Sequence, residues 1–279
     1  MGIIDSSKVL LDFAWSCANL PMLVKAAIKA VKLRDLIEKN KALEGCHAGE
    51  RCFVLGNGPS LKFVDPALLK GEILFAVNML YRSPLFEELS PSYYCAVDPG
   101  MFTSYRDELL EIVESNSRIR FIFSDCAVDG FASLPNVFIA LTGVHATSSC
   151  HAFDLTKPCC SFINVVPFAI QCALYMGFKE IYLLGCDFNQ FAFHVDSHIY
   201  EEADRKRTQP LLSDLLGHSI ALMQHEHLNK YASREGVFVA NATKNSLLDV
   251  YPSVELCDIL NGAAKPLVDG SSSPIRHCK

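Results

Sequence analysis

The residues with the clearest capacity for chemistry form a short turn, Gly56-Asn57-Gly58-Pro59-Ser60, directly after an apolar run from Cys52 to Leu55. Such a run is typical of a buried strand. The glycines let the backbone turn sharply and let a ligand approach the main-chain amides, while Asn57 offers an amide group and Ser60 a hydroxyl. The pattern is neither a Walker loop nor G-x-G-x-x-G. It predicts a phosphate or nucleotide site, with a purely structural turn as the alternative.

Polar residues end three further expected strands. Asn78 follows residues 72–77, Asp98-Pro99-Gly100 follows residues 93–97, and Asp187 follows residues 180–184. Ligands of open parallel sheets bind at the carboxyl ends of the strands, so we expect these residues to lie near the Asn57 turn. Asp98 and Asp187 could together hold Mg²⁺ with a triphosphate, or each could accept hydrogen bonds from loop amides or a ribose.

The elements that must position these residues alternate along the chain. Strands are expected at residues 52–55, 72–77, 93–97, 119–123, 136–141, 180–184 and 237–240, and helices at 7–42 with Pro21 as an interruption, 161–176 and 213–234. This order predicts an α/β fold with a Rossmann-like, mostly parallel sheet flanked by helices. We expect an N-terminal helical appendage (1–48), a nucleotide-sugar-binding α/β domain (49–261) with a lid insertion at about 188–212, and a disordered tail (262–279).

Composition narrows the class of protein. Half of the 279 residues are hydrophobic, and the net charge of −6 argues against a nucleic-acid binder. No continuous apolar run reaches the roughly 18–20 residues of a spanning helix, and no signal peptide is evident. Twelve scattered cysteines without a C-x-x-C pair favour reduced, buried thiols and a cytoplasmic protein.

The first expected helix is basic, with Lys8, Lys25, Lys29, Lys32 and Arg34, while the chain as a whole is acidic. One interpretation is an appendage that packs on the domain or on a partner. The other is an interfacial helix, within residues 7–42, that rests on an anionic membrane surface.

Several blocks together resemble a known family. The turn at Gly56–Leu61 is followed by Asp65, Asn78 and Asp98-Pro99-Gly100-Met101-Phe102, then by residues 177–188, by Gly217-His218-Ser219 and by Asn245-Ser246-Leu247-Leu248. In type, order and spacing these resemble the bacterial sialyltransferases of glycosyltransferase family 42, over about residues 51–256. The first block is also similar to bacterial surface-glycan proteins of unknown function and to archaeal pterin pyrophosphokinase-like proteins.

The resemblance implies roles for individual residues. Asn57, Asn78 and the Asp98-Pro99-Gly100 turn would hold the CMP part of a CMP-sugar, and the Asn245-Ser246 loop would contact the nucleotide as well. A histidine would take the proton from the acceptor hydroxyl, with inversion and without a metal ion or other cofactor. His218 is favoured for this role over His198, and both stay open.

The sequence departs from the family in two places, near the start of the helix before residues 180–184 and in the lid. Asn164-Val165 stands where the family has a Thr-Ser or similar pair, and Asn189 stands where a tyrosine is expected to hold the leaving phosphate. Tyr200 could supply one such hydroxyl. The favoured function is a sialyltransferase-like glycosyltransferase for lipopolysaccharide or capsule, at the inner face of the membrane, with a homo-oligomer left open. An ATP- and Mg²⁺-dependent pyrophosphokinase-like enzyme and a non-catalytic nucleotide-sugar-binding protein are the alternatives.

Overall fold

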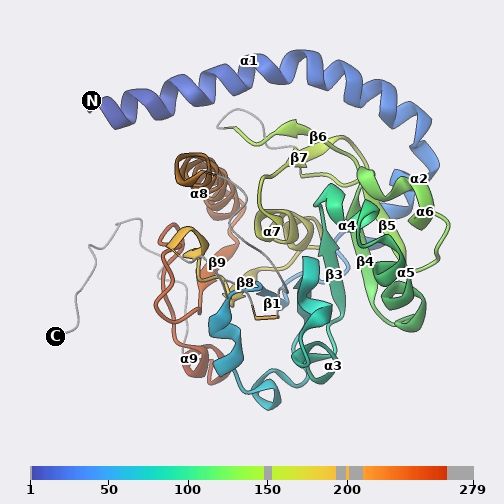
Figure 1. Cartoon of the computed structure of the whole chain (residues 1–279), viewed down its shortest axis with the longest axis vertical. Helices are drawn as coiled ribbons and strands as arrows, with labels where there is room; N and C mark the ends of the chain where they lie inside the picture. Colours follow the sequence, from blue (N-terminus) through green and yellow to red (C-terminus); the bar gives the residue numbers. More distant parts are fainter. Residues whose placement is uncertain (1, 148–152, 193–198, 201–209, 263–279) are drawn as a thin grey trace.

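The computed structural model describes residues 2–147, 153–192, 199–200 and 210–262. Its main sheet has seven parallel strands in the order β5-β4-β3-β2-β1-β8-β9 (Figure 1). The strands are β1 (Arg51–Leu55), β2 (Leu74–Val77), β3 (Tyr93–Ala96), β4 (Arg120–Ser124), β5 (Val137–Ala140), β8 (Glu180–Leu184) and β9 (Phe238–Asn241). The predicted Rossmann-like α/β fold is confirmed.

Helices cover both faces of this sheet. The helices of the described residues are α1 (Ile3–Lys32), α2 (Arg34–Glu38), α3 (Leu85–Leu89), α4 (Pro99–Thr103), α5 (Arg106–Ser115), α6 (Val128–Phe131), α7 (Val165–Tyr175), α8 (Leu211–Arg234) and α9 (Leu256–Leu260). The apolar runs arise because the strands are buried on both sides: Cys52 and Val54 belong to one core, whereas Phe53 and Leu55 belong to the other. The α7 helix packs across β1, β2 and β3.

The strand order places a topological switch at the centre of the sheet. From β1 the chain moves outward through β2, β3, β4 and β5, and it returns through α7 to β8, on the other side of β1. The carboxyl ends of β1 and β8 are therefore adjacent, and the loops that follow them lead to opposite sides of the sheet. Ligands of open α/β sheets bind at such a point.

The N-terminal helix differs from its prediction. The α1 helix continues through Pro21 to Lys32, and Arg34–Glu38 and a 3₁₀ turn at Lys39–Leu43 follow it. Pro21 removes one backbone donor without ending the helix. The helix lies along the outside of the molecule, over a two-strand parallel sheet of β6 (Thr142–His145) and β7 (Cys159–Ser161), which was not predicted (Figure 1).

The ten cysteines in the described part of the chain are free thiols. Six of them are buried: Cys52, Cys95, Cys159, Cys160, Cys172 and Cys186. Burial raises the pKa of the Cys159 and Cys186 thiols to about 12, so both stay protonated and act as small apolar side chains.

Candidate functional site

A cavity of about 1060 Å³ opens at the carboxyl end of the sheet, at the switch between β1 and β8. Loops after β1, β2, β3, β7, β8 and β9 and parts of α7 and α8 line it. Of the predicted site residues, its wall includes Gly56, Asn57, Gly58, Asn78, Asp98, Pro99, Asn164, Asp187, Asn189, Tyr200 and His218. Pro59, Ser60, Gly100, Asn245 and Ser246 do not line it, and His198 lies outside the described residues.

The glycine turn does not present its amides as expected. The Gly56 amide donates to the Leu184 carbonyl oxygen at 2.7 Å, and the Gly58 amide donates to that of Gly185 at 2.8 Å. The Ser60 amide and hydroxyl both reach the Asp187 carboxylate, at 3.4 and 2.7 Å. The expectation that these amides face a phosphate is therefore wrong, because the end of β8 accepts their hydrogen bonds.

The close approach of these two loops explains the glycines. A β-carbon on Gly56 would overlap the carbonyl oxygen of Gly185, and one on Gly58 would overlap the Asp187 carboxylate. Gly185 itself has a φ of +65°, which favours glycine. The glycines are thus required for packing between the ends of β1 and β8.

Three asparagine side chains in the cavity wall carry unsatisfied oxygens. The buried Oδ1 atoms of Asn57, Asn78 and Asn189 accept no hydrogen bond within the described structure. A buried polar atom without a partner costs free energy, and native proteins keep few of them. Because the three residues come from the loops after β1, β2 and β8, their oxygens are candidates to accept hydrogen bonds from a ligand.

The carboxylates at the ends of β3 and β8 accept hydrogen bonds from the loops of the protein. Asp98 Oδ1 accepts from the Gly100 amide at 2.8 Å and caps α4, while Asp187 holds Ser60. Within the described residues, no group of three or more His, Cys, Asp or Glu side chains could hold a metal ion. Asp98 and Asp187 were expected either to bind Mg²⁺ or to accept hydrogen bonds from loops, and the structure shows the hydrogen bonds.

Side chains of two other predicted site loops, before α7 and after β9, form hydrogen bonds to the protein backbone. The Asn164 side chain accepts from the Val166 amide at 2.9 Å and caps α7, with the residue still in the cavity wall. The Ser246 hydroxyl donates to the Cys186 carbonyl oxygen at 2.6 Å. Asn245 is exposed and adopts a φ of +58°, which asparagine tolerates.

The His218 imidazole has a defined tautomer. Its Nδ1 lies 2.8 Å from the backbone carbonyl oxygen of Asp214, one turn earlier on α8. A carbonyl oxygen only accepts, so Nδ1 carries the hydrogen and Nε2 carries the lone pair in the neutral ring. His218 lines the cavity, and its ring packs edge-on against Phe188 and Phe191 at 5.2 and 5.3 Å. A proton acceptor is thus held in a fixed orientation.

Phe188, directly after Asp187, is strained. Its φ is +57°, a conformation that costs a bulky residue about 1–3 kcal/mol. The ring of Phe188 lies between His218 and a second histidine, His225, whose ring centroid is 6.0 Å away. Backbone strain of this kind often accompanies a functional site.

Sequence reasoning missed His225, Arg82 and Tyr105 in the cavity wall. His225 is fully buried, its Nδ1 is 2.9 Å from the Tyr251 hydroxyl, and burial lowers its pKa to about 3. Arg82 forms two hydrogen bonds to Glu108, at 2.7 and 2.6 Å, and lies 4.8 Å from the Tyr105 ring centroid. Arg82 could have been predicted as a site residue from its position in the loop after β2, four residues beyond Asn78.

The described end of the predicted lid touches the turn after β1. The Ile199 amide donates to the Asn57 carbonyl oxygen at 2.8 Å, and Ile199 and Tyr200 are both buried. Tyr200 therefore reaches the cavity beside Asn57. Residues 193–198 and 201–209 of the predicted lid lie outside the described residues.

No protein-family model matches the chain, and no curated protein matches it. Solved structures with a similar arrangement include the monofunctional α-2,3-sialyltransferase Cst-I from Campylobacter jejuni. That likeness has 16% identity and a TM-score of 0.49, and it covers 75% of this chain and 81% of Cst-I.

Two further structures are similar at the same level. The sialyltransferase CstII from Campylobacter jejuni, in complex with cytidine-5'-monophosphate, shares 18% identity with a TM-score of 0.47, over 74% of this chain and 85% of CstII. The MAf glycosyltransferase from Magnetospirillum magneticum AMB-1 shares 17% identity with a TM-score of 0.47, over 81% of this chain and 39% of that protein. At this level of sequence identity, the likeness describes how the chain is folded and says nothing of the reaction.

Proposed function

We propose that the chain is a glycosyltransferase that moves a sugar of the sialic-acid type from a CMP-activated donor to a glycan acceptor, with inversion. One observation carries the proposal: the His218 ring, in the wall of the cavity, donates from Nδ1 to Asp214 and so holds a lone pair on Nε2. The motifs that resemble the family 42 sialyltransferases agree with it in order and spacing.

The chemical step needs one base and no redox partner. The acceptor hydroxyl oxygen forms a bond to the anomeric carbon, while the bond from that carbon to the phosphate oxygen of the donor breaks. The electron pair of the broken bond leaves with CMP, and the hydroxyl proton passes to Nε2 of His218. The Asp214 carbonyl oxygen stabilises the resulting imidazolium, because it already accepts from Nδ1.

Donor binding would use the unsatisfied asparagine oxygens. A cytosine amino group and ribose hydroxyls donate hydrogen bonds, and Oδ1 of Asn57 and Asn78 accept none within the described structure. Tyr105 offers an exposed aromatic face in the same wall, and Arg82 adds a cation whose charge Glu108 partly balances. In this proposal, no metal ion is required.

The pyrophosphokinase alternative depends on Asp98 and Asp187 as Mg²⁺ ligands. Both carboxylates accept hydrogen bonds from the protein, Asp98 from its own turn and Asp187 from the turn after β1, which favours the transferase. The non-catalytic alternative depends on the absence of two groups that the family has, since Asn164 stands at one position before α7 and Asn189 at one in the lid. The orientation of His218 favours a catalytic protein instead.

Ligand protection against thermal unfolding separates these functions, because a ligand that binds only the folded state raises its stability. We expect CMP to raise the midpoint of thermal unfolding without Mg²⁺, and we expect hydrolysis of CMP-sialic acid that His218→Gln slows by about 10²–10⁴-fold. Protection by ATP only with Mg²⁺ would favour the pyrophosphokinase. Binding of CMP with no donor hydrolysis in any variant would favour a non-catalytic protein.

The biological setting follows from the same proposal. The acceptor would be a growing lipopolysaccharide or capsule glycan, and the enzyme would work in the cytoplasm at the inner face of the membrane. Gel filtration with light scattering would show whether it acts as a homo-oligomer.

A further inference from the structure

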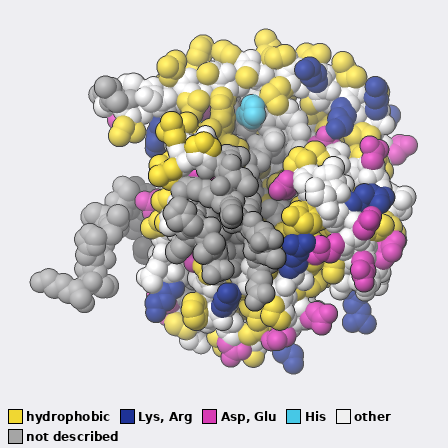
Figure 2. All heavy atoms as spheres, viewed as in Figure 1, with side chains coloured by type: hydrophobic (Ala, Val, Ile, Leu, Met, Phe, Trp, Pro, Cys, Tyr) yellow, Lys and Arg dark blue, Asp and Glu magenta, His cyan; other side chains and the backbone are white. Residues whose placement is uncertain are grey.

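The α1 helix turns its apolar side away from the protein. Its 30 residues extend about 45 Å. Nine large apolar side chains of the helix are 45–78% exposed, and all of these except Ile4 lie on this side: Val9, Leu10, Phe13, Leu20, Leu23, Val24, Ile28 and Val31. At 100° per residue they share one side, about 140° wide, and hydrophobic atoms follow this outer edge of the molecule (Figure 2). A helix that packs on a soluble domain normally has the opposite arrangement.

Polar contacts hold the other side of α1 to the domain. The Asn19 side chain donates to the His145 carbonyl oxygen at 3.0 Å and accepts from the His145 amide at 2.7 Å. Lys8 pairs with Glu226 on α8, and Asp12 pairs with His227, both at 3.0 Å. The first half of the helix is therefore tied to the domain by hydrogen bonds and ion pairs.

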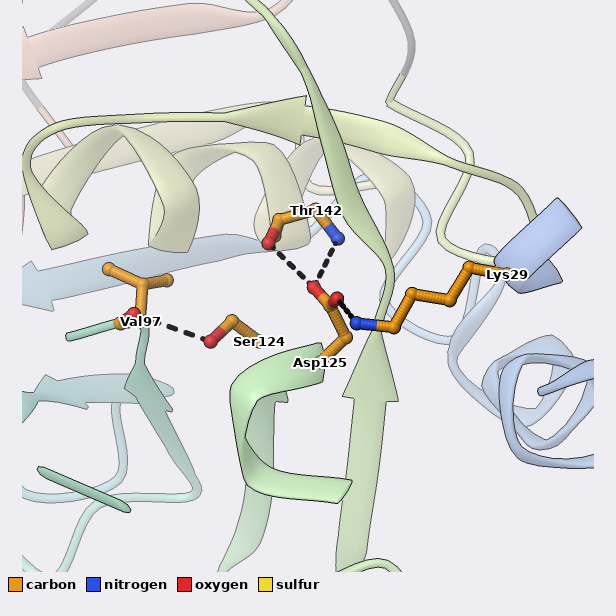
Figure 3. A network of polar contacts seen from close by, with 5 residues as sticks. All are labelled: Lys29, Val97, Ser124, Asp125 and Thr142. Carbon is orange, nitrogen blue, oxygen red and sulfur yellow. Dashed lines mark hydrogen bonds and ion pairs between the residues drawn. The ribbon is translucent and has the colours of Figure 1, made fainter. Parts of the chain in front are cut away.

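The second half is tied down in the same way. Lys29 pairs with Asp125, whose other oxygen accepts from the amide and hydroxyl of Thr142 at 2.9 and 2.8 Å (Figure 3). Ala26 is buried against Gly143, where a β-carbon would overlap the Ala26 methyl group. These contacts fix which side of α1 faces out.

Charge indicates what covers the outer side. The sequence from Ser6 to Lys32 contains one acidic residue, Asp12, and its side chain faces the domain. Lys25 and Lys32 are exposed near one border of the apolar side. In a dimer built on this side, lysines of the two copies would face the same contact and repel each other, whereas an anionic bilayer attracts them.

We infer that α1 lies in the plane of an anionic membrane surface and inserts its outer side among the acyl chains, while the domain stays in water. The helix is long and apolar enough, by length and composition, to cross a membrane. Crossing would carry Lys8, Asp12, Asn19 and Lys29 into hydrocarbon and break their contacts with the domain, which is costly. An in-plane position keeps all of these contacts.

Vesicle flotation of the full chain tests the membrane and its charge. We expect flotation with phosphatidylglycerol-rich vesicles and much weaker flotation with pure phosphatidylcholine. Leu20→Glu with Val24→Glu should weaken partitioning roughly tenfold for each lost apolar contact. Lys25→Gln and Lys32→Gln should each weaken it about fivefold on the anionic vesicles only. The control Phe63→Glu, at an 89% exposed residue outside α1, should change nothing.

Fluorescence tests the orientation, because Trp15 is the single tryptophan of the chain and its ring packs 5.0 Å from that of His145. Brominated lipid should leave Trp15 unquenched and should quench the double variant Trp15→Phe, Phe13→Trp. Quenching of both would mean a spanning or detached helix and would overturn the inference. So would an absence of flotation together with a dimer that the Leu20→Glu, Val24→Glu variant dissociates.

Discussion

The Ser60 hydroxyl donates a hydrogen bond of 2.7 Å to the Asp187 carboxylate, 127 positions further along the chain. This contact joins the turn after β1 to the turn after β8. These two strands are neighbours at the point where the chain stops adding strands on one side of β1 and begins on the other. The two residues are adjacent because β1 and β8 pair in register, Leu55 opposite Leu184. The packing of these two turns against each other therefore depends on the pairing of β1 with β8 and not on either loop alone.

We predict that Gly58→Ala destabilises the protein by about 2–3 kcal/mol, because the new methyl group would overlap the Asp187 carboxylate and the Gly185 carbonyl oxygen. The matched control is Gly217→Ala, on α8, where a β-carbon meets nothing within 4 Å. That change should stabilise the protein by about 0.5–1 kcal/mol, as alanine does in a helix. Chemical denaturation measures both. Equal stability of the two variants would contradict the packing account.

Nucleotide binding should depend on the unsatisfied asparagines. Asn57→Ala and Asn78→Gly should each weaken CMP binding about tenfold, the loss of a hydrogen bond to a buried group. Glycine is chosen at position 78 because its φ is +44°. Calorimetric titration with CMP provides the measurement.

Asn245→Gly is the comparison for these variants. Glycine keeps the left-handed backbone, and Asn245 is exposed and does not line the cavity. We expect CMP affinity to be unchanged. A loss as large as that of Asn57→Ala would instead place the nucleotide on the loop after β9, as the family resemblance implies.

His218→Gln should lower the rate of sugar transfer about 10²–10⁴-fold, the usual contribution of a general base. CMP affinity should stay close to that of the unchanged protein, because the lost group acts on the acceptor hydroxyl. His227→Gln, on the same helix but paired with Asp12 and absent from the cavity wall, is the control and should retain the rate. A His218 variant at full rate would assign the base to another residue.

Stability should fall in acid because of His225. Burial lowers its pKa from 6.5 to about 3, so the unfolded chain binds a proton that the folded protein does not. The folded state then loses roughly 1.4 kcal/mol for each pH unit below about 6, down to about 3. Denaturation at pH 7 and pH 5 should show this dependence reduced in His225→Phe. An unchanged slope would mean that another group controls the acid limit.

The sequence predicted the main strands because their residues are buried on both faces and read as short apolar runs, as in Phe53 and Val54. The grouping of polar residues at the carboxyl ends of the strands was also predicted, because polar residues end those runs. The small sheet of β6 and β7 was missed, since Cys159-Cys160-Ser161 is too short to show a period. Pro21 predicted an interruption, but the contacts of Asn19 and Ala26 hold the helix on both sides of it.

The site was harder to predict than the fold. Whether an asparagine caps a helix, as Asn164 does, or leaves its oxygen unsatisfied, as Asn57 does, depends on neighbours distant in sequence. The engagement of the Gly58 amide by Gly185 arises from strand pairing that no local pattern encodes. The burial of His225 likewise comes from Tyr251 and Phe188, on other elements.

The most direct test is a crystal structure of the protein soaked with CMP. We predict the nucleotide in the cavity between β1 and β8, with Oδ1 of Asn57 or Asn78 accepting from the cytidine and the phosphate directed toward Nε2 of His218. CMP bound elsewhere, or a phosphate turned away from α8, would contradict the proposed transferase site.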